Sequence, residues 1–290
     1  MQVKRARVSG FCGDNGKFGV SGAIRLAQET ALADPGRVYI VGDLVHNHHV
    51  TAWLVKSYGL HFVSKLDDVP DTATVVIKAH GAPPDFMAAA AQKNLHLIDA
   101  TCPMVKAAQL LVRQYVAAGK KIIYVASKKD HDEAISVSRQ VLSGVKVVTL
   151  NELQDLEIKK PQETVVLTQT TLSVLETRAQ FAALQKKYPT LTIRPHLCTA
   201  TTQRQEAVLE LAEQVDLLIV VGAPHSSNSM RLLEVAASTG RPAYAVNDVS
   251  ELQRSWFDQS IYTVGVIAGA STPAWITDEV VTTIQGYHHD

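Results

Sequence analysis

The sequence predicts an α/β fold made of three similar small units with mostly parallel sheets. Short β-branched runs alternate with helical stretches along almost all of the 290 residues, a pattern typical of parallel sheets. Some runs are apolar throughout, as residues 217–221 are, which indicates strands buried on both faces. Three cysteines, Cys12, Cys102 and Cys198, lie 90 and 96 residues apart, and each follows a predicted strand. This near-regular spacing predicts three units that each supply one thiolate.

The cysteines set the expected domain boundaries near residues 100 and 196, giving units of residues 1–100, 101–196 and 197–290. Between the strands, residues 203–215 place apolar side chains at helical spacing, and Ser173 with Glu176 predicts a capped helix start. The expected strands, in chain order, are Ala6–Gly10, Arg37–Val41, Thr74–Lys78, His96–Asp99, Lys121–Ala126, Lys146–Leu150, Thr164–Thr168, Leu191–Arg194, Asp216–Val221, Ala243–Val246 and Ile261–Ile267.

Composition excludes several classes of protein. Lys plus Arg and Asp plus Glu both number 28, so a zero net charge gives no support to a nucleic-acid or membrane-surface partner. No apolar run approaches the roughly 20 residues that span a bilayer, and no signal peptide is visible at the start. Few, widely spaced cysteines argue against a disulfide framework. We therefore expect a cytoplasmic protein with no nucleic-acid or membrane partner.

Polar residues follow the predicted strands directly, where parallel sheets bind ligands and helix N-termini attract anions. Seven such turns are rich in Ser, Thr, Asn, His and Glu, which loop composition alone does not explain. They are Gly42–His46, Ala79–Gly81, Asp99–Cys102, Asp130–Glu133, Thr168–Thr171, His225–Asn228 and Ala268–Ser271.

The three cysteines point to a metal centre, although one cysteine alone after a strand is usually a small buried hydrophobic residue. Thiolates select zinc, copper(I) or iron–sulfur clusters. Structural zinc usually shows a Cys-x2–4-Cys knuckle, which is absent from this sequence. We therefore expect the three units to pack around a central iron–sulfur cluster with one ligand position open to a substrate.

Among the other polar residues, His46, His80 and His131 lie in strand-end turns, and we expect each to be functional. His48 and His49 are interpreted as surface neighbours of His46 or as supporting residues. Glu133 follows a histidine by two residues, and a carboxyl beside a metal centre can hold a raised pKa and deliver protons.

An ordered set of motifs runs from residue 9 to about residue 275: Gly-Phe-Cys12, Val-His46-Asn, Ala-His80-Gly, Asp-Ala-Thr-Cys102-Pro, His131-Asp-Glu133, Thr-Gln-Thr170-Thr-Leu-Ser, Cys198-Thr-Ala-Thr-Thr-Gln-Arg-Gln-Glu-Ala-Val, Ser226-Ser-Asn228-Ser and Ala-Gly-Ala-Ser271. Taken together, these motifs closely resemble the 4-hydroxy-3-methylbut-2-enyl diphosphate reductase family, also called LytB or IspH.

The resemblance implies a role for each matching residue. Cys12, Cys102 and Cys198 would hold a 4Fe–4S cluster with one open iron. Glu133 would be the proton donor, assisted by His131 and Thr170 at the catalytic site. The substrate would be held by His46, His80, His131, Thr170, Ser226, Ser227, Asn228 and Ser271.

The implied reaction is a two-electron, two-proton reductive dehydroxylation in the non-mevalonate isoprenoid pathway. The cluster iron would bind the substrate hydroxyl, and Glu133 would protonate the departing oxygen. The products would be isopentenyl and dimethylallyl diphosphate, and the electron donor would be a protein such as ferredoxin or flavodoxin.

The chain departs from the family pattern at two places. Residues 13–18 separate Cys12 from the Gly-Val pair that follows more closely in relatives, and Asp132 stands where relatives commonly have Pro. Three other functions stay open at this point: a hydro-lyase that uses the cluster only as a Lewis acid, a sensor that binds the diphosphate without turnover, and a zinc hydrolase.

Overall fold

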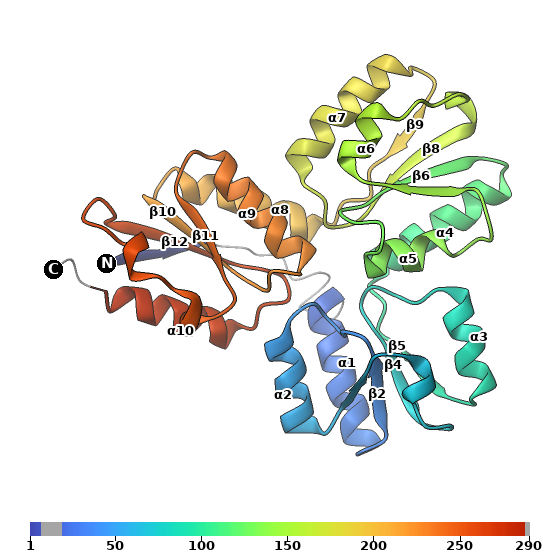
Figure 1. Ribbon diagram of the computed structural model, residues 1–290, viewed down its shortest axis with the longest axis horizontal. Coiled ribbons are helices and arrows are strands. Elements are labelled where there is room, and N and C mark those ends of the chain that lie inside the picture. The colour runs from blue at the N-terminus through green and yellow to red at the C-terminus, as the bar shows by residue number, and fades with distance from the viewer. Residues whose placement is uncertain (7–18, 288–290) are drawn as a thin grey trace. The chain divides into compact units, whose positions relative to one another are not determined.

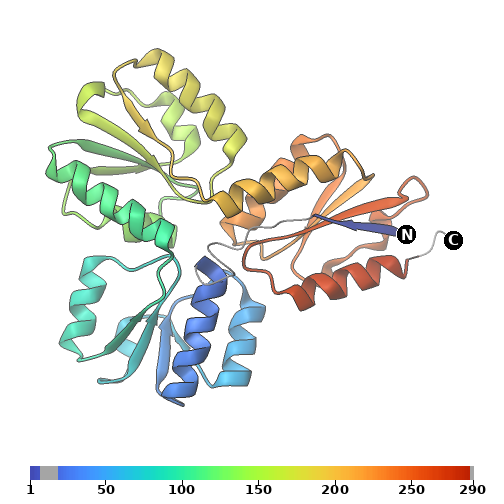
Figure 2. The same ribbon diagram turned by 180° about the vertical axis from the view of Figure 1, so that it is seen from behind.

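The computed structural model describes residues 1–6 and 19–287. Within them, twelve strands form three sheets of four strands each, and every strand pair is parallel (Figures 1 and 2). The predicted fold class of three small parallel α/β units is confirmed.

The three sheets share one strand order. The first is ordered β3 (His61–Val63), β2 (Val38–Val41), β4 (Thr74–Ile77), β5 (His96–Asp99). The second is ordered β7 (Val145–Val148), β6 (Lys121–Val125), β8 (Thr164–Thr168), β9 (Thr192–Arg194). The third is ordered β11 (Ala243–Val246), β10 (Leu217–Val221), β12 (Thr263–Ala268), β1 (Gln2–Arg5). The order is second, first, third, fourth in each sheet when the strands are counted along the chain from β2, β6 and β10 and β1 is counted as the fourth strand of the third sheet.

The third sheet takes its fourth strand from the other end of the chain. Gln2 to Arg5 of β1 pair in register with Thr263 to Val266 of β12. The predicted division assigned this first strand to the unit of residues 1–100, so that assignment is wrong for β1. The physical reason is that only three strands follow residue 197 within the described chain, and β1 fills the position that β5 and β9 fill elsewhere.

The other strand predictions agree with the structure to within a residue or two, with one omission. β3 was missed because it has only three residues and a largely exposed His61, which leaves no periodic apolar pattern. The first strand was predicted at residues 6–10, but it spans Gln2–Arg5. Residues 7–10 lie outside the described chain.

Helices cover both faces of the sheets, as the alternation of strand side chains requires. In the third sheet Leu217 and Ile219 pack with Ile276 of α10, whereas Leu218 and Val220 pack on the opposite face. The helices are α1 (Gly19–Ala33), α2 (His48–Tyr58), α3 (Pro84–Gln92), α4 (Pro103–Ala117), α5 (Asp132–Ser138), α6 (Leu150–Asp155), α7 (Val174–Lys187), α8 (Thr199–Ala212), α9 (Ser227–Ser238) and α10 (Ala274–Gln285).

Two sequence predictions about helices are confirmed. The apolar stripe of residues 207–215 is buried along α8 and after it, against the third sheet. Ser173 caps α7, where its side chain accepts a hydrogen bond from the backbone N–H of Glu176.

The described chain divides into two compact units. The smaller unit contains residues 1–6, 46–50 and 199–287 and holds the third sheet. The larger unit contains residues 19–45 and 51–198 and holds the first and second sheets. The segment of residues 46–50 thus belongs to the smaller unit although its neighbours in the chain belong to the larger one.

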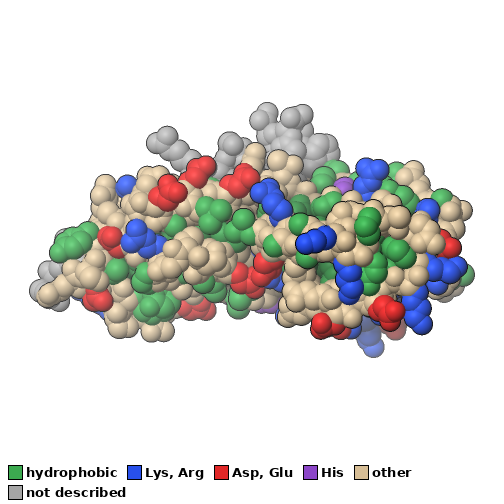
Figure 3. All heavy atoms as spheres, turned by 90° about the horizontal axis from the view of Figure 1, so that it is seen from above, with side chains coloured by type: hydrophobic (Ala, Val, Ile, Leu, Met, Phe, Trp, Pro, Cys, Tyr) green, Lys and Arg blue, Asp and Glu red, His purple; other side chains and the backbone are tan. Residues whose placement is uncertain are grey.

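Among the described residues no helix is long and apolar enough to cross a membrane. On the face drawn in Figure 3, acidic and basic side chains are interspersed.

Candidate active site

The predicted site residues other than the cysteines all follow the first or third strand of a sheet. His46 and His80 follow β2 and β4, and Glu133 and Thr170 follow β6 and β8. Ser226, Ser227 and Asn228 follow β10, and Ser271 follows β12. The first and third strands of each sheet are neighbours, and the connections that leave them run to opposite sides of the sheet. Sheets of this kind bind ligands in the crevice at the carboxyl ends of these two strands. The strand order therefore places these residues at three equivalent positions.

In the larger unit, Glu133 is the centre of a buried hydrogen-bond network. It lies in the first turn of α5 and is 2% exposed. Its Oε1 accepts hydrogen bonds from the backbone N–H of Thr170 at 2.8 Å and from the hydroxyl of Tyr124 at 3.0 Å. Its Oε2 accepts one from the Thr170 hydroxyl at 2.8 Å. The carboxyl group is therefore fixed in place by groups of β6 and of the turn after β8.

Burial raises the pKa of Glu133 above its ordinary value of 4.5, and the nearby Cys198 adds to that effect. The hydrogen bonds from Thr170 and Tyr124 oppose the rise because they favour the ionised form. Burial and the neighbouring Glu133 raise the pKa of Tyr124 well above 10, so this phenol stays protonated and donates. A buried carboxyl with a raised pKa and a fixed orientation is suited to deliver a proton.

His131 and His80 lie beside this network. His131 caps α5, with its Nδ1 accepting a hydrogen bond from the Glu133 N–H at 3.1 Å. Nδ1 is then the acceptor of the neutral ring, which leaves Nε2 as the N–H donor. The His80 ring meets the His131 ring edge to face at 5.6 Å. The backbone O of His80 accepts a hydrogen bond from Ser136 Oγ at 2.6 Å, which attaches the turn after β4 to α5.

Gly81 is needed for that turn. Its φ of +80° lies in the left-handed region. A Cβ atom at this position would meet side-chain atoms of Gln109 at 2.7 Å, Ser136 at 3.0 Å and Thr101 at 3.1 Å. The glycine in the Ala-His-Gly motif therefore allows α4 and α5 to pack closely on the His80 turn.

Two predicted cluster ligands lie in the larger unit, each after the fourth strand of its sheet and just before a helix. Cys102 is the N-cap of α4, and Cys198 comes directly before α8. Both are thiols rather than half-cystines, and amides at a helix N-terminus stabilise a thiolate. Cys12 follows β1 in the sequence, but it lies outside the described residues. The two described cysteines thus have the donor chemistry and the equivalent placement that a thiolate-bound centre requires.

In the smaller unit, the N-terminus of α9 carries a buried polar group. Ser226 caps the helix by accepting a hydrogen bond from the N–H of Ser229. Asn228 is 6% exposed, and neither Nδ2 nor Oδ1 of its amide has a hydrogen-bond partner among the described residues. Buried amides without partners are rare in proteins. This amide is therefore available for a polar ligand at the N-terminus of α9.

His46 and Ser271 meet in the same unit. The Ser271 hydroxyl donates a hydrogen bond to the backbone O of His46 at 3.2 Å, and Ser271 is 6% exposed. The His46 ring lies edge to face with the ring of His225 at 6.3 Å. The structure therefore joins the turn after β12 to the segment of residues 46–50, far away in the sequence.

Two parts of the site were not predicted from the sequence. Tyr124 lies in a predicted strand, and the sequence does not identify the partner that a buried tyrosine hydroxyl needs. Lys78 forms an ion pair of 2.6 Å with Asp132, and both side chains are largely buried. Asp132 departs from the family pattern, and the sequence does not identify Lys78 as its partner.

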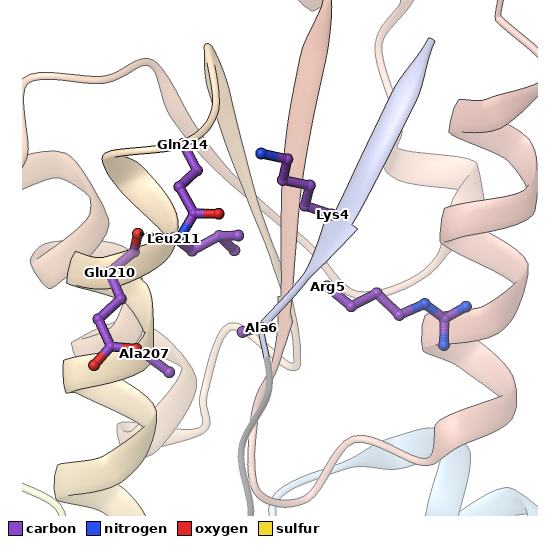
Figure 4. A pocket seen from close by; sticks show the side chains of 7 residues that line it. All are labelled: Lys4, Arg5, Ala6, Ala207, Glu210, Leu211 and Gln214. Carbon is purple, nitrogen blue, oxygen red and sulfur yellow. Dashed lines mark hydrogen bonds between the residues drawn. The ribbon is translucent and has the colours of Figure 1, made fainter.

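A pocket in the smaller unit lies apart from these residues (Figure 4). It measures about 550 Å³ and opens beside the edge strand β1. Arg5 turns toward α10, where it pairs with Asp278 at 2.5 Å. The lining residues are Lys4, Arg5, Ala6, Ala207, Glu210, Leu211 and Gln214. None of them is a predicted site residue.

Comparison with known proteins gives consistent results. Residues 3–285 match the family described as LytB protein. A "4-hydroxy-3-methylbut-2-enyl diphosphate reductase" of Neisseria gonorrhoeae is 41% identical over 291 residues, with 98% of this chain and 87% of the relative covered. The protein of the same description from Acidithiobacillus ferrooxidans is 34% identical, with 99% and 90% covered.

Two solved structures are also similar to this chain. The "E-1-hydroxy-2-methyl-but-2-enyl-4-diphosphate reductase from Plasmodium falciparum" matches with a TM-score of 0.90 and 30% identity, covering 98% of this chain and 88% of that one. A second structure, described as "(E)-4-Hydroxy-3-methyl-but-2-enyl Diphosphate Reductase, the Terminal Enzyme of the Non-Mevalonate Pathway", matches with a TM-score of 0.67 and 32% identity, covering 99% of both chains. The full-length match, the motifs and the shared fold lead to one conclusion: this chain belongs to the LytB protein family.

Proposed function

We propose that this protein is an oxidoreductase that converts 4-hydroxy-3-methylbut-2-enyl diphosphate to isopentenyl and dimethylallyl diphosphate. The names of the relatives support this activity. Within this structure, the main support for the activity is the buried carboxyl group of Glu133. Thr170 and Tyr124 orient this carboxyl group, and its pKa is raised. A reductive dehydroxylation needs such an acid because hydroxide is a poor leaving group.

The overall reaction breaks the allylic C–O bond and consumes two electrons and two protons. One proton leaves with the oxygen as water, and the other is added to the allylic carbon skeleton. Addition at one or the other end of the allyl system gives the two isomeric diphosphates. Electrons would come from a donor protein such as ferredoxin or flavodoxin.

The three cysteines would hold the cofactor. Cys102 and Cys198 have equivalent places after the fourth strands β5 and β9, and Cys12 has the matching place in the sequence after β1. A bound 4Fe–4S cluster with one open iron would supply single electrons and a Lewis acid for the substrate hydroxyl. The family membership and the thiol donors support this assignment.

The diphosphate would be bound without lysine or arginine. Hydroxyl, amide and imidazole N–H groups donate hydrogen bonds to phosphate oxygens, and a helix N-terminus adds favourable partial charge. In the smaller unit the unpartnered amide of Asn228 and the N-terminus of α9 fit this role. The full proposed set is His46, His80, His131, Thr170, Ser226, Ser227, Asn228 and Ser271.

Within the catalytic group, Glu133 would hold the proton that goes to the departing oxygen. Thr170 would fix the carboxyl through its two hydrogen bonds of 2.8 Å. His131 would offer its Nε2–H to the substrate, because its Nδ1 is engaged by the N–H of Glu133. Each role is thus assigned to an atom with a defined partner.

Replacing Glu133 with Gln tests this assignment, because Gln keeps the shape of the side chain and cannot donate an acidic proton. Turnover with reduced viologen should fall by roughly 10²–10⁴-fold, the usual contribution of a general acid. Iron and sulfide content should match those of the wild type. An unchanged rate with a full cluster would remove Glu133 from the mechanism.

A further inference from the structure

Two adjacent histidines and one aspartate converge in the smaller unit, and none of the proposed roles uses them. His48 and His49 open α2, and Asp248 lies between β11 and the short 3-10 helix η4 (Val249–Glu251). One donor atom from each residue lies within 4.8 Å of the other two. The His48 and His49 rings are 4.0 Å apart, and His49 Nε2 is 3.1 Å from Asp248 Oδ2.

The aspartate is held in one orientation. Asp248 Oδ1 accepts hydrogen bonds from the backbone N–H of Ser250 at 2.8 Å and from its hydroxyl at 2.6 Å. Those two bonds leave Oδ2 facing His49. Metal-binding carboxylates are commonly oriented by hydrogen bonds of this kind, which fix one oxygen and leave the other to the metal.

Asn247 gives a second, independent observation. It is 6% exposed, its Nδ2 lies 3.2 Å from His48 Nδ1 and 3.4 Å from His48 Nε2, and its Oδ1 has no hydrogen-bond partner among the described residues. A half-turn of this amide exchanges Oδ1 and Nδ2 and brings the oxygen beside both ring nitrogens of His48. The oxygen is thus a further buried polar group beside the three donor atoms, and buried polar groups without partners are rare in proteins.

We propose that His48, His49 and Asp248 bind a divalent transition-metal ion of the zinc class, with water completing the coordination. Two neutral imidazoles and one carboxylate are a donor set that zinc uses when it keeps a water ligand. The N-terminus of α2 opposes a cation, and the negative charge of Asp248 offsets this. The bound ion would tie the segment that carries His46 to the turn after β11, so its role is structural.

The test uses the full chain with its cluster loaded and oxygen excluded, so that the cysteines are already occupied. Equilibrium dialysis against zinc, followed by metal analysis, measures zinc per chain. The wild type should bind one more zinc ion per chain than Asp248→Asn or His49→Gln does. In each of these two variants the dissociation constant for zinc at this site should rise at least tenfold. As a control, His61→Gln changes a histidine of β3 that is not one of the three proposed zinc ligands, and this variant should bind zinc as the wild type does.

Zinc-edge X-ray absorption of the wild type identifies the ligands without any variant. We expect nitrogen and oxygen neighbours at about 2.0–2.2 Å, with imidazole scattering and no sulfur. Sulfur neighbours at about 2.3 Å would place the zinc on cysteines and overturn the proposal. Equal zinc content in the wild type and the variants would overturn it too. His48 is exposed, so His48→Gln keeps the comparison possible if another variant fails to fold.

Discussion

Replacing Thr170 with Val removes one hydrogen bond from Glu133 and keeps the shape of the side chain. The Thr170 hydroxyl donates to Oε2 at 2.8 Å, whereas the backbone N–H bond to Oε1 is unaffected by the substitution. A hydrogen bond to a charged group contributes about 1.5–3 kcal/mol. Its loss should raise the ratio of protonated to ionised Glu133 by roughly 10- to 100-fold, since about 1.4 kcal/mol corresponds to a factor of ten.

The assay is the pH dependence of kcat under saturating substrate and reductant. If Glu133 acts as the acid, activity falls as pH rises through the pKa of this carboxyl. Burial already holds that pKa above its ordinary value, and losing a hydrogen bond to the ionised form raises it further. The alkaline limb of the profile should therefore move to higher pH in Thr170→Val.

A matched control is Thr164→Val. Thr164 is also buried, lies at the opposite end of β8, and donates its hydroxyl only to the backbone O of Lys160 in the described hydrogen bonds. The alkaline limb of the pH profile of kcat should lie at the same pH in Thr164→Val as in the wild type. A limb that stays in place in Thr170→Val, or moves equally in both variants, would refute the assignment of that limb to Glu133.

Three other changes give distinct expectations. Because the pKa of Glu133 is raised in the folded state, the free energy of unfolding of the wild type should fall as pH rises from 4.5 through the folded-state pKa. Glu133→Gln should lack this fall, so its melting temperature should exceed that of the wild type at alkaline pH. An equal decline of the melting temperature in both proteins would contradict the effect of burial on Glu133. Lys78→Met leaves Asp132 unpaired and should lower the free energy of unfolding, measured in urea, by about 1–3 kcal/mol. The double variant Lys78→Met with Asp132→Asn should lose less stability than the sum of the two single variants. Strict additivity would show that the ion pair contributes nothing. Cys102→Ser should lose most iron and sulfide by chemical analysis, and full retention would exclude this thiol as a ligand.

The fold was largely predictable because most of the described strands, unlike β3, carry their own apolar signal. In the second sheet Ile123 and Val125 face α6 and α7, whereas Ile122 and Tyr124 face α4 and α5, so runs of this kind stand out in the sequence. The position of β1 was not predictable. A short strand with exposed ends carries no information about which of three similar sheets it completes.

The candidate site was predictable where position after a strand was enough. Glu133 and Thr170 lie after β6 and β8, and the structure brings them into contact as the parallel order requires. Tyr124 and the partner of Asp132 were missed for a different reason. Their contacts depend on which face of a strand meets which helix and on side-chain reach, and strand-end position says nothing about either.

The most direct test of the proposed activity is anaerobic turnover of 4-hydroxy-3-methylbut-2-enyl diphosphate by the cluster-loaded protein with reduced viologen. We expect the dye to be oxidised at two electrons per substrate, with isopentenyl and dimethylallyl diphosphate both formed, and no reaction without reductant. Substrate conversion without reductant would contradict a reductase and indicate a hydro-lyase. No conversion despite a full cluster would show that this member of the LytB family has another activity.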